Sequence, residues 1–341
     1  MQNLTRAHNE LYRRSPDEHF PTLDALWRHC QEQKERSIDQ WHAPVLMLPE
    51  VDSGRLALRL DQEGNFQMND WSFTQLCRFA EVSKDTLNKL APQTAREVFR
   101  ETMPGGTKPF QVLTLDNTVR SIHGASYTRL YNADLLSLVH EFAVDFRPPQ
   151  EASGSGTGLY CGEQDMFCFL IDPLGWTEIE GEAFAPGFFL WNSEVGRRTV
   201  GVQTFWFQAV CQNHIVWDAV DVVEFSRKHT ANVHDSMDAI RRIIENLATT
   251  RDRRRDGFVK VIQNAMHAKL GKDADEVLKA LHKHGFSHAL AQQALDTAVQ
   301  NGKFTIFAVV DALTRLSGKL SNAGERTEAD AKAAGLLALA A

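Results

Sequence analysis

The chain is poor in cysteine and has no long apolar run. Its 341 residues include five cysteines, an odd number without the dense, regular spacing of a disulfide framework. No segment approaches the roughly 18 consecutive apolar residues that a membrane-spanning helix needs. The first segment, MQNLTRAHNELYRR, lacks the apolar centre of a signal peptide. These absences predict a cytoplasmic protein with reduced thiols and no membrane contact.

Complete catalytic motifs are missing as well. The sequence contains no G-x-S-x-G nucleophile elbow, no Walker A phosphate loop and no C-x-x-C pair. The formal net charge is -7 and the sequence pI is about 6.0. An acidic chain is poorly suited to coat duplex DNA non-specifically, although a local basic groove can still hold a nucleic acid. We expect no cofactor.

The most informative stretch that is present covers residues 186–230. Apolar and polar positions alternate through two aromatic-rich runs, which are separated by a polar tip from Asn192 to Arg198. Cationic residues occur at this tip and again at Arg227-Lys228-His229. The pattern predicts a twisted antiparallel hairpin with a polar, partly basic rim.

The whole chain is predicted to be an α+β protein. A curved antiparallel sheet from residues 110–225 should pack on a long helix over residues 233–256, because that helix carries an apolar stripe. We divide the chain into an N-terminal α/β region with a helix pair (1–105), a central α+β sheet domain (106–256) and a C-terminal helical unit (257–341). The Ala/Leu-rich tail from residue 329 is expected to fray.

The helix pair over residues 74–90 has the apolar spacing of a DNA-reading helix-turn-helix. Ser83 is a good N-cap for the second helix. However, Glu81 occupies the turn position where glycine is favoured, and Asp85 would repel phosphate. An ordinary packed helix pair explains the same pattern, so both interpretations stay open.

A metal site is a second candidate. Cys211, His214, His229 and His234 are residue types that zinc accepts. The alternative is that Cys211 is a buried thiol in an apolar strand. A related hypothesis is a metal-dependent hydrolase or nuclease acting through Glu194, Asp218, His214 and His229, which stoichiometric metal in the purified protein would support.

The leading candidate is a groove for single-stranded nucleic acid. Cations that follow a phosphate backbone, together with aromatic rings on which bases stack, are what such binding needs. The phosphate-binding residues are predicted to be Arg129, Arg197, Arg198, Arg227 and Lys228, and the stacking residue is Trp191. The supporting rim is predicted to be Tyr127, Asn132, Asn192, Glu194 and His229. Alternatively, the aromatic residues fill the core and the arginines pair with glutamates.

If the groove is real, replacing Arg197 and Arg198 together by alanine should weaken binding and flatten its salt dependence by up to about two units. The main alternative function is a non-enzymatic factor that binds a host protein through the C-terminal helices. A homo-oligomer is also compatible with the sequence, because an exposed hairpin edge can pair between subunits.

Four segments of the chain resemble the phage- and plasmid-borne proteins of domain-of-unknown-function family 932. The first, second and fourth segments are Trp71 to Cys77, Arg120 to Leu136, and Phe307 to Thr314. The third is the string Trp191-Asn192-Ser193-Glu194-Val195-Gly196, which is followed by Cys211 to His214 and by His229-Thr230. The resemblance covers roughly residues 60–341, and Asn-Ser-Glu-Val-Gly is its most specific part. It implies a mobile-element context, in which recombination, replication or evasion of host defence are typical roles, and it implies no defined activity.

Overall fold

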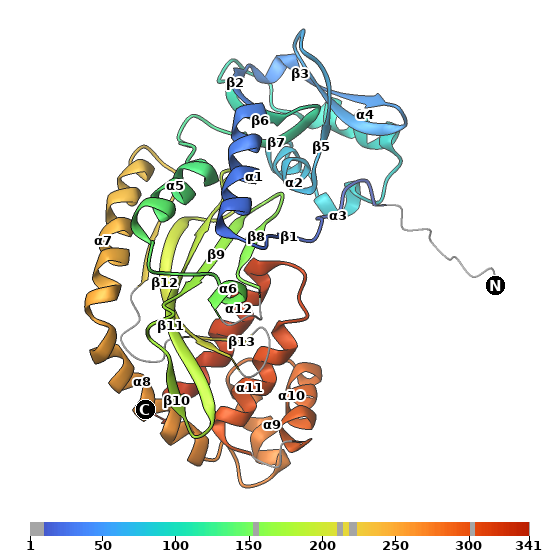
Figure 1. The fold of residues 1–341 in the computed structure, drawn as a ribbon. Helices are drawn as coiled ribbons and strands as arrows, with labels where there is room; N and C mark the ends of the chain where they lie inside the picture. Colours follow the sequence, from blue (N-terminus) through green and yellow to red (C-terminus); the bar gives the residue numbers. More distant parts are fainter. Residues whose placement is uncertain (1–9, 153–156, 210–213, 218–223, 301–303, 341) are drawn as a thin grey trace, which may run out of the picture.

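The computed structural model describes residues 10–152, 157–209, 214–217, 224–300 and 304–340. It is an α+β fold with two sheets, as predicted, and Figure 1 shows one sheet above the other. No helix in these ranges is long and apolar enough to cross a membrane.

The large sheet is antiparallel and contains the predicted hairpin. Its described strands run in the order β1-β8-β9-β11-β12-β13, with β10 paired to β11 and β14 paired to β12. Their bounds are β1 Glu18–His19, β8 Leu159–Cys161, β9 Met166–Ile171, β10 Thr177–Ile179, β11 Glu182–Asn192, β12 Val200–Gln208, β13 His214–Trp217 and β14 Glu224–Arg227. The alternating runs of the sequence form β11 and β12, and the polar tip joins them.

The second sheet, which we call the N-terminal sheet, has the described order β2-β6-β7-β5-β4-β3. Its bounds are β2 Ser37–His42, β3 Met47–Asp52, β4 Arg55–Leu60, β5 Gly64–Met68, β6 Phe110–Leu115 and β7 Thr118–His123. The prediction of one sheet over residues 110–225 was therefore wrong for residues 110–123. Val112, Val119 and Ile122 face the apolar core of the N-terminal sheet instead, so the proposed boundary at residue 105 falls inside this sheet.

Three helices cover one face of the large sheet: α1 (Leu23–Arg36), α5 (Asn132–Phe142) and α7 (Ser236–Thr249). Ile240 and Ile244 of α7 pack with Phe188 and Leu190 of β11, which confirms that an apolar helix stripe covers the sheet. The predicted helix over residues 233–256 is not continuous, however. It consists of the 3-10 turn η2 (Val233–Asp235), then α7, and then α8 (Arg251–His267), which begins after a break at Thr250.

The C-terminal unit lies beside the other face of the large sheet (Figure 1). Its helices are α9 (Ala274–Lys283), α10 (His288–Gln300), α11 (Ile306–Ser317) and α12 (Ala323–Ala334), followed by the 3-10 segment η3 (Gly335–Ala340). Ala323 and Ala334 pack on phenylalanines of β9 and β11. The expected fraying of the tail was wrong, because Leu336 and Leu337 are fully buried in the core of this unit.

The helix pair near residue 80, for which a DNA-reading role and ordinary packing were both open, is too short for a DNA-reading helix-turn-helix. α2 (Asp70–Phe79) is followed by α3 (Lys84–Leu87), which is a single turn, and by α4 (Pro92–Thr102). Phe73 and Leu76 of α2 are buried in the core of the N-terminal sheet. A one-turn helix cannot supply a recognition surface along the major groove, so the packed helix pair is the interpretation that the structure supports. The remaining short elements are α6 (Pro149–Ala152) and η1 (Pro44–Leu46).

Candidate functional site

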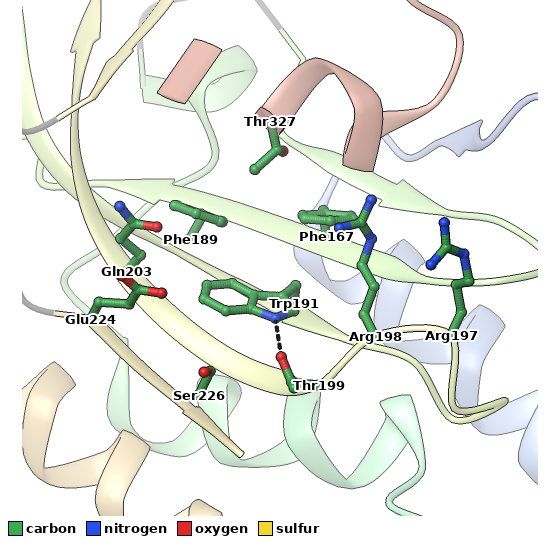
Figure 2. Close-up of a pocket in the computed structure, with 10 residues that line it drawn as sticks. All are labelled: Phe167, Phe189, Trp191, Arg197, Arg198, Thr199, Gln203, Glu224, Ser226 and Thr327. Carbon is green, nitrogen blue, oxygen red and sulfur yellow. Dashed lines mark hydrogen bonds between the residues drawn. The ribbon is translucent and has the colours of Figure 1, made fainter. Parts of the chain in front are cut away.

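A pocket of about 430 Å³ lies on the large sheet near the tip of the hairpin. It is lined by Phe167, Phe189, Trp191, Arg197, Arg198, Thr199, Gln203, Glu224, Ser226 and Thr327. Figure 2 shows the Trp191 ring in the middle of this hairpin pocket, with Thr327 of α12 opposite it. Strands β9, β11, β12 and β14 form the floor, and α12 forms part of a wall.

The register of the strands explains why these side chains share one face. Phe167, Trp191, Gly201 and Ser226 are cross-strand partners in one row. The adjacent row consists of Phe169, Phe189, Gln203 and Glu224. Side chains two residues apart in a strand point to the same face, so the two rows form one surface. The residues that β9 and β11 contribute to that surface are aromatic, whereas β12 and β14 contribute one glycine and three polar residues.

Trp191 is held by its neighbours. Its indole nitrogen donates a hydrogen bond to the Thr199 hydroxyl at 3.2 Å, and its ring stacks on Phe189 with centroids 5.2 Å apart. A Cβ atom at Gly201 would lie only 2.2 Å from Trp191 Cζ2. Glycine at 201 therefore allows the indole ring to lie against β12, and the ring stays half-buried with one side open to the pocket.

The two arginines at one end of the pocket have different surroundings. Arg198 pairs with the buried carboxylate of Asp165 at 2.8 Å and with Glu328 of α12 at 2.8 Å. Arg197 is exposed, and its guanidinium lies 5.6 Å from the centre of the Trp71 ring. No ion pair joins Arg197 to any other residue within the described ranges. Arg197 is thus the more available cation for a bound anion.

Gln203 and Glu224 occupy the opposite end of the pocket from the arginines (Figure 2). Glu224 is exposed and Gln203 is half-buried. Neither side chain forms a hydrogen bond or an ion pair with another described residue. The pocket therefore presents cations at one end, aromatic faces in the middle, and an amide with a carboxylate at the other end.

Next to the pocket, the hairpin tip is anchored to the N-terminal sheet by buried charges. The carboxylate of Glu194 pairs with Arg120 of β7 and accepts a hydrogen bond from the backbone N–H of Asn132 at 3.1 Å. Arg129 donates to the Glu194 carbonyl and pairs with Asp39 of β2 at 2.7 Å. Burying charges requires partners of this kind. We call this cluster of Asp39, Arg120, Arg129 and Glu194 the buried joint.

The residue after Glu194 extends the same contact. The Val195 carbonyl accepts hydrogen bonds from Trp71 Nε1 at 2.7 Å and from His123 Nε2 at 2.8 Å. A Cβ atom at Gly196 would lie 2.5 Å from the His123 ring and 2.8 Å from the Tyr127 ring, and Gly196 has a φ of 72°. Close approach and left-handed backbone both favour glycine there. The Glu-Val-Gly string is thus a structural anchor.

Burial sets the protonation of the rings beside the joint. His123, Tyr127 and His229 are stacked, with centroids 3.7 and 5.5 Å apart. Burial lowers the pKa of His123 to about 3 and that of His229 to about 4, and the positive charge of Arg129 lowers both values further. Burial also raises the pKa of the Tyr127 hydroxyl. All three rings are therefore neutral near pH 7 and do not attract phosphate.

Of the six predicted nucleic-acid-binding residues, the structure brings Trp191, Arg197 and Arg198 together in the hairpin pocket. Arg129 is buried in the joint, so its assignment to phosphate was wrong. Arg227 points to the opposite face of the sheet, where it pairs with Asp235 at 3.6 Å. Lys228 is exposed beyond the end of β14 and does not line the pocket.

The five predicted rim residues are partly or fully buried around the joint rather than arranged on an open rim. Asn192 donates hydrogen bonds to the Leu130 carbonyl and to the side chain of Asn132, each at 2.9 Å. Tyr127 donates to the Glu194 carbonyl at 2.8 Å. His229 is buried against the Tyr127 ring. These side chains orient the hairpin tip, and they are not positioned to touch a ligand in the pocket.

The metal hypotheses find no support in the described part of the chain, where no group of three His, Cys, Asp or Glu side chains is arranged to hold a metal ion. Cys211 and Asp218 lie outside the described residues, and only the backbone of His214 is described. His229 contacts aromatic neighbours as described above, while His234 lies in the turn η2.

Several pocket residues were not predicted from the sequence. Phe167, Phe189, Gln203, Glu224 and Ser226 share strand parity with Trp191, so the alternation contained a usable signal once the register was known. Thr327 lies far along the chain on α12, and no local pattern points to it.

Comparison of the chain with models of protein families, with curated proteins and with solved structures finds no match. The resemblance to domain-of-unknown-function family 932 therefore remains an expectation from the residues named above.

Proposed function

We propose that the protein binds single-stranded nucleic acid and that the hairpin pocket holds one nucleotide of the strand. The observation that carries this proposal is the aromatic surface of Trp191, open to a pocket with an unpaired Arg197 at its end. Base stacking on an aromatic ring and a cation for the phosphate are the two components of single-strand binding. No cofactor enters the proposal.

Single strands fit this pocket better than duplexes. A base can enter a pocket between a sheet and a helix only if it is unpaired and unstacked. The volume of about 430 Å³ is in the range of small-molecule sites. The short α3 offers no groove-reading helix, and the overall net charge of -7 opposes non-specific duplex binding.

The direct test is fluorescence anisotropy with labelled single- and double-stranded 12-mers across a salt series, using metal-free protein. We expect single strands to bind more tightly than duplexes and binding to persist at about 0.15 M salt. If neither the single-stranded nor the double-stranded 12-mer binds, the proposal is wrong. Strand annealing, suggested by the mobile-element resemblance, is then tested with complementary strands.

Arg197→Ala should weaken single-strand binding and lower the slope of log affinity against log salt by about 0.7, the contribution of one phosphate contact. Replacing Arg198 as well should add less than a second contact of this size, because Arg198 already pairs with Asp165 and Glu328. Arg59→Ala, which removes an exposed arginine of β4 far from the pocket, is the matched control. An unchanged slope in Arg197→Ala would remove Arg197 from the interface.

Trp191→Ala should cost about 1–3 kcal/mol of binding free energy through lost stacking. Trp191→Phe keeps a smaller ring and should retain part of the affinity. Because Trp191 also packs on Phe189, circular dichroism and thermal unfolding must show that both variants are folded. Equal affinities for wild type, Trp191→Phe and Trp191→Ala would show that no base stacks on this ring.

A second candidate function, binding of a host protein, rests on an apolar groove of about 350 Å³ between C-terminal helices. Its apolar lining includes Phe286, Leu290, Leu313, Leu316 and Leu320. A groove of this kind accommodates the apolar face of a partner helix. Affinity for nucleic acid that disappears at physiological salt would favour this function over strand binding.

A further inference from the structure

The polar end of the hairpin pocket has a composition that simple strand binding does not explain. Glu224 places an exposed, unpaired carboxylate among groups that would hold a polyanion. A negative charge weakens binding to phosphates in general. Its presence makes physical sense if it faces hydrogen-bond donors of the ligand and not phosphate oxygens.

Gln203 and Glu224 are direct cross-strand partners on β12 and β14, so their side chains stand next to each other on the pocket face. Gln203 is in turn the cross-strand partner of Phe189, which stacks on Trp191. Figure 2 shows both polar side chains at the end of the pocket away from Arg197. A base on the Trp191 ring, with its phosphate near Arg197, would present its outer edge to this pair.

The pair has a defined hydrogen-bonding pattern. A glutamine amide can donate from nitrogen and accept at oxygen, whereas an ionised carboxylate only accepts. The Watson–Crick edge of guanine carries one acceptor, O6, beside two donors, N1–H and the N2 amino group. The amide nitrogen of Gln203 can donate to O6 while the two oxygens of Glu224 accept from N1–H and N2–H.

Other bases complement this pair less well. Adenine and cytosine each place one amino donor beside a ring nitrogen that accepts, and thymine and uracil place two oxygens around a single N–H. Those acceptors would face the carboxylate and repel it. We infer that the hairpin pocket selects guanine, with Gln203 and Glu224 as its specificity-determining residues. The inference rests on the proposed function, since it assumes that a base stacks on Trp191.

The experiment compares labelled 12-mers that differ only at alternate positions: d(TG)6, d(TA)6, d(TC)6 and (dT)12. We expect d(TG)6 to bind roughly tenfold more tightly than the others, the usual value of a bidentate base contact. d(TI)6, in which inosine lacks the N2 amino group of guanine, should bind with intermediate affinity. Equal affinities for all strands would overturn the inference and leave strand binding intact.

Glu224→Gln should reduce the preference for d(TG)6 over d(TA)6 to near one, because the amide replaces one accepting oxygen of the carboxylate by an NH2 donor, which would face N1–H or N2–H of guanine. The same variant should bind (dT)12 at least as well as wild type does, since it removes a negative charge. A misfolded variant would instead lose affinity for d(TG)6 and for (dT)12 alike. Glu178→Gln, which neutralises an exposed glutamate of β10 outside the pocket, should keep the wild-type preference.

Guanosine monophosphate distinguishes a base in a strand from a free nucleotide. Competition by GMP that requires far higher concentrations than d(TG)6 supports guanine in a strand, and competition at equal concentration assigns the pocket to a free guanine nucleotide. If no strand binds, the proposed function fails, and titration with GMP and AMP decides the inference. If GMP quenches tryptophan fluorescence, AMP does not, and the quenching is lost in Trp191→Phe, the result supports guanine selection. Equal quenching by GMP and AMP overturns it.

Discussion

Asp330 is a carboxyl group inside the C-terminal unit, with 1% of its surface exposed. The Ser317 hydroxyl donates a hydrogen bond to it, and Arg326 lies 3.8 Å away. Burial outweighs these partners and raises its pKa to about 7, whereas the unfolded chain should show a value near 3.8. The folded protein therefore holds this proton more tightly than the unfolded chain does.

The consequence is a stability that falls with rising pH. Asp330 contributes its full stabilisation below about pH 4 and loses it as the pH rises through about 7. Asp330→Asn keeps a neutral group that accepts from Ser317, so its free energy of unfolding relative to wild type should rise across this window, by at most about 4 kcal/mol. Urea unfolding at pH 4, 5.5 and 7.5 measures the difference. A difference independent of pH would contradict the assignment.

Single arginines also show what sequence can and cannot predict. Arg129 and Arg197 both occur in polar segments between predicted elements, and both were assigned to phosphate. Arg197 is exposed, whereas Arg129 pairs with Asp39, which is 90 positions away. The partner that decides whether an arginine is available lies in another element, and local pattern contains no information about it. Trp191, in contrast, could be predicted as the aromatic residue of the pocket from strand alternation alone.

Among the elements, the turn between α2 and α3 carries local strain. Glu81 adopts a φ of 54°, a left-handed conformation that costs a residue with a side chain roughly 1 kcal/mol or more. The sequence correctly marked this position as one where glycine is favoured. The turn nevertheless connects to a single-turn helix, α3, and both α2 and α3 contribute apolar residues to the core of the N-terminal sheet.

Glu81→Gly should therefore stabilise the protein by up to about 1 kcal/mol, since relief of the strain exceeds the added entropy of the unfolded chain. Chemical denaturation at constant pH provides the measurement. Glu32→Gly, at an exposed position inside α1, is the matched control and should instead cost about 1 kcal/mol. Destabilisation by both substitutions would show that the turn is not strained.

The segment η3 provides a second test at the scale of elements. Leu337 is fully buried, while 51% of Leu339, two residues later, is exposed. Leu337→Ala should cost about 2–5 kcal/mol, and Leu339→Ala should change stability by less than about 0.5 kcal/mol. Thermal and urea unfolding of the two variants compare them directly. Similar small effects would mean that the tail frays after all, as its composition suggested.

Periodicity thus predicted the hairpin and the apolar helix beneath it, and composition misjudged the tail. An Ala/Leu-rich segment looks like a marginal isolated helix, yet Leu336 and Leu337 are buried by α8 and α11. The same limit applies to strands β6 and β7, whose alternation is correct but whose sheet is chosen by long-range pairing with β2 and β5. Local patterns define elements, and contacts between distant segments decide their partners.

At the scale of the whole molecule, the buried joint connects the two sheets. Glu194 lies at the hairpin tip of the large sheet, and Arg120 and Asp39 belong to the N-terminal sheet. Removing one member of a buried ion pair leaves an uncompensated charge, which typically costs 3–5 kcal/mol. Substitutions in the buried joint should therefore destabilise both sheets.

Glu194→Gln should lower the free energy of unfolding by about 3–5 kcal/mol and reduce hydrogen-exchange protection in β7 and β11 together. Native-state exchange followed by mass spectrometry resolves the two strands. Glu224→Gln, at an exposed carboxylate of the same large sheet, should leave both protection and stability close to wild type. Loss of protection confined to one sheet would show that the sheets unfold independently.

The wall that Thr327 adds to the hairpin pocket also bears on how the protein is made. α12 begins where Asp17 accepts a hydrogen bond from the backbone N–H of Ala323, 306 positions later in the chain. On the ribosome, β9, β11, β12 and β14 emerge well before this helix is synthesised. A nascent chain would therefore display the open aromatic floor of the pocket during translation, and the wall that contains Thr327 would be added only when the last helix is synthesised.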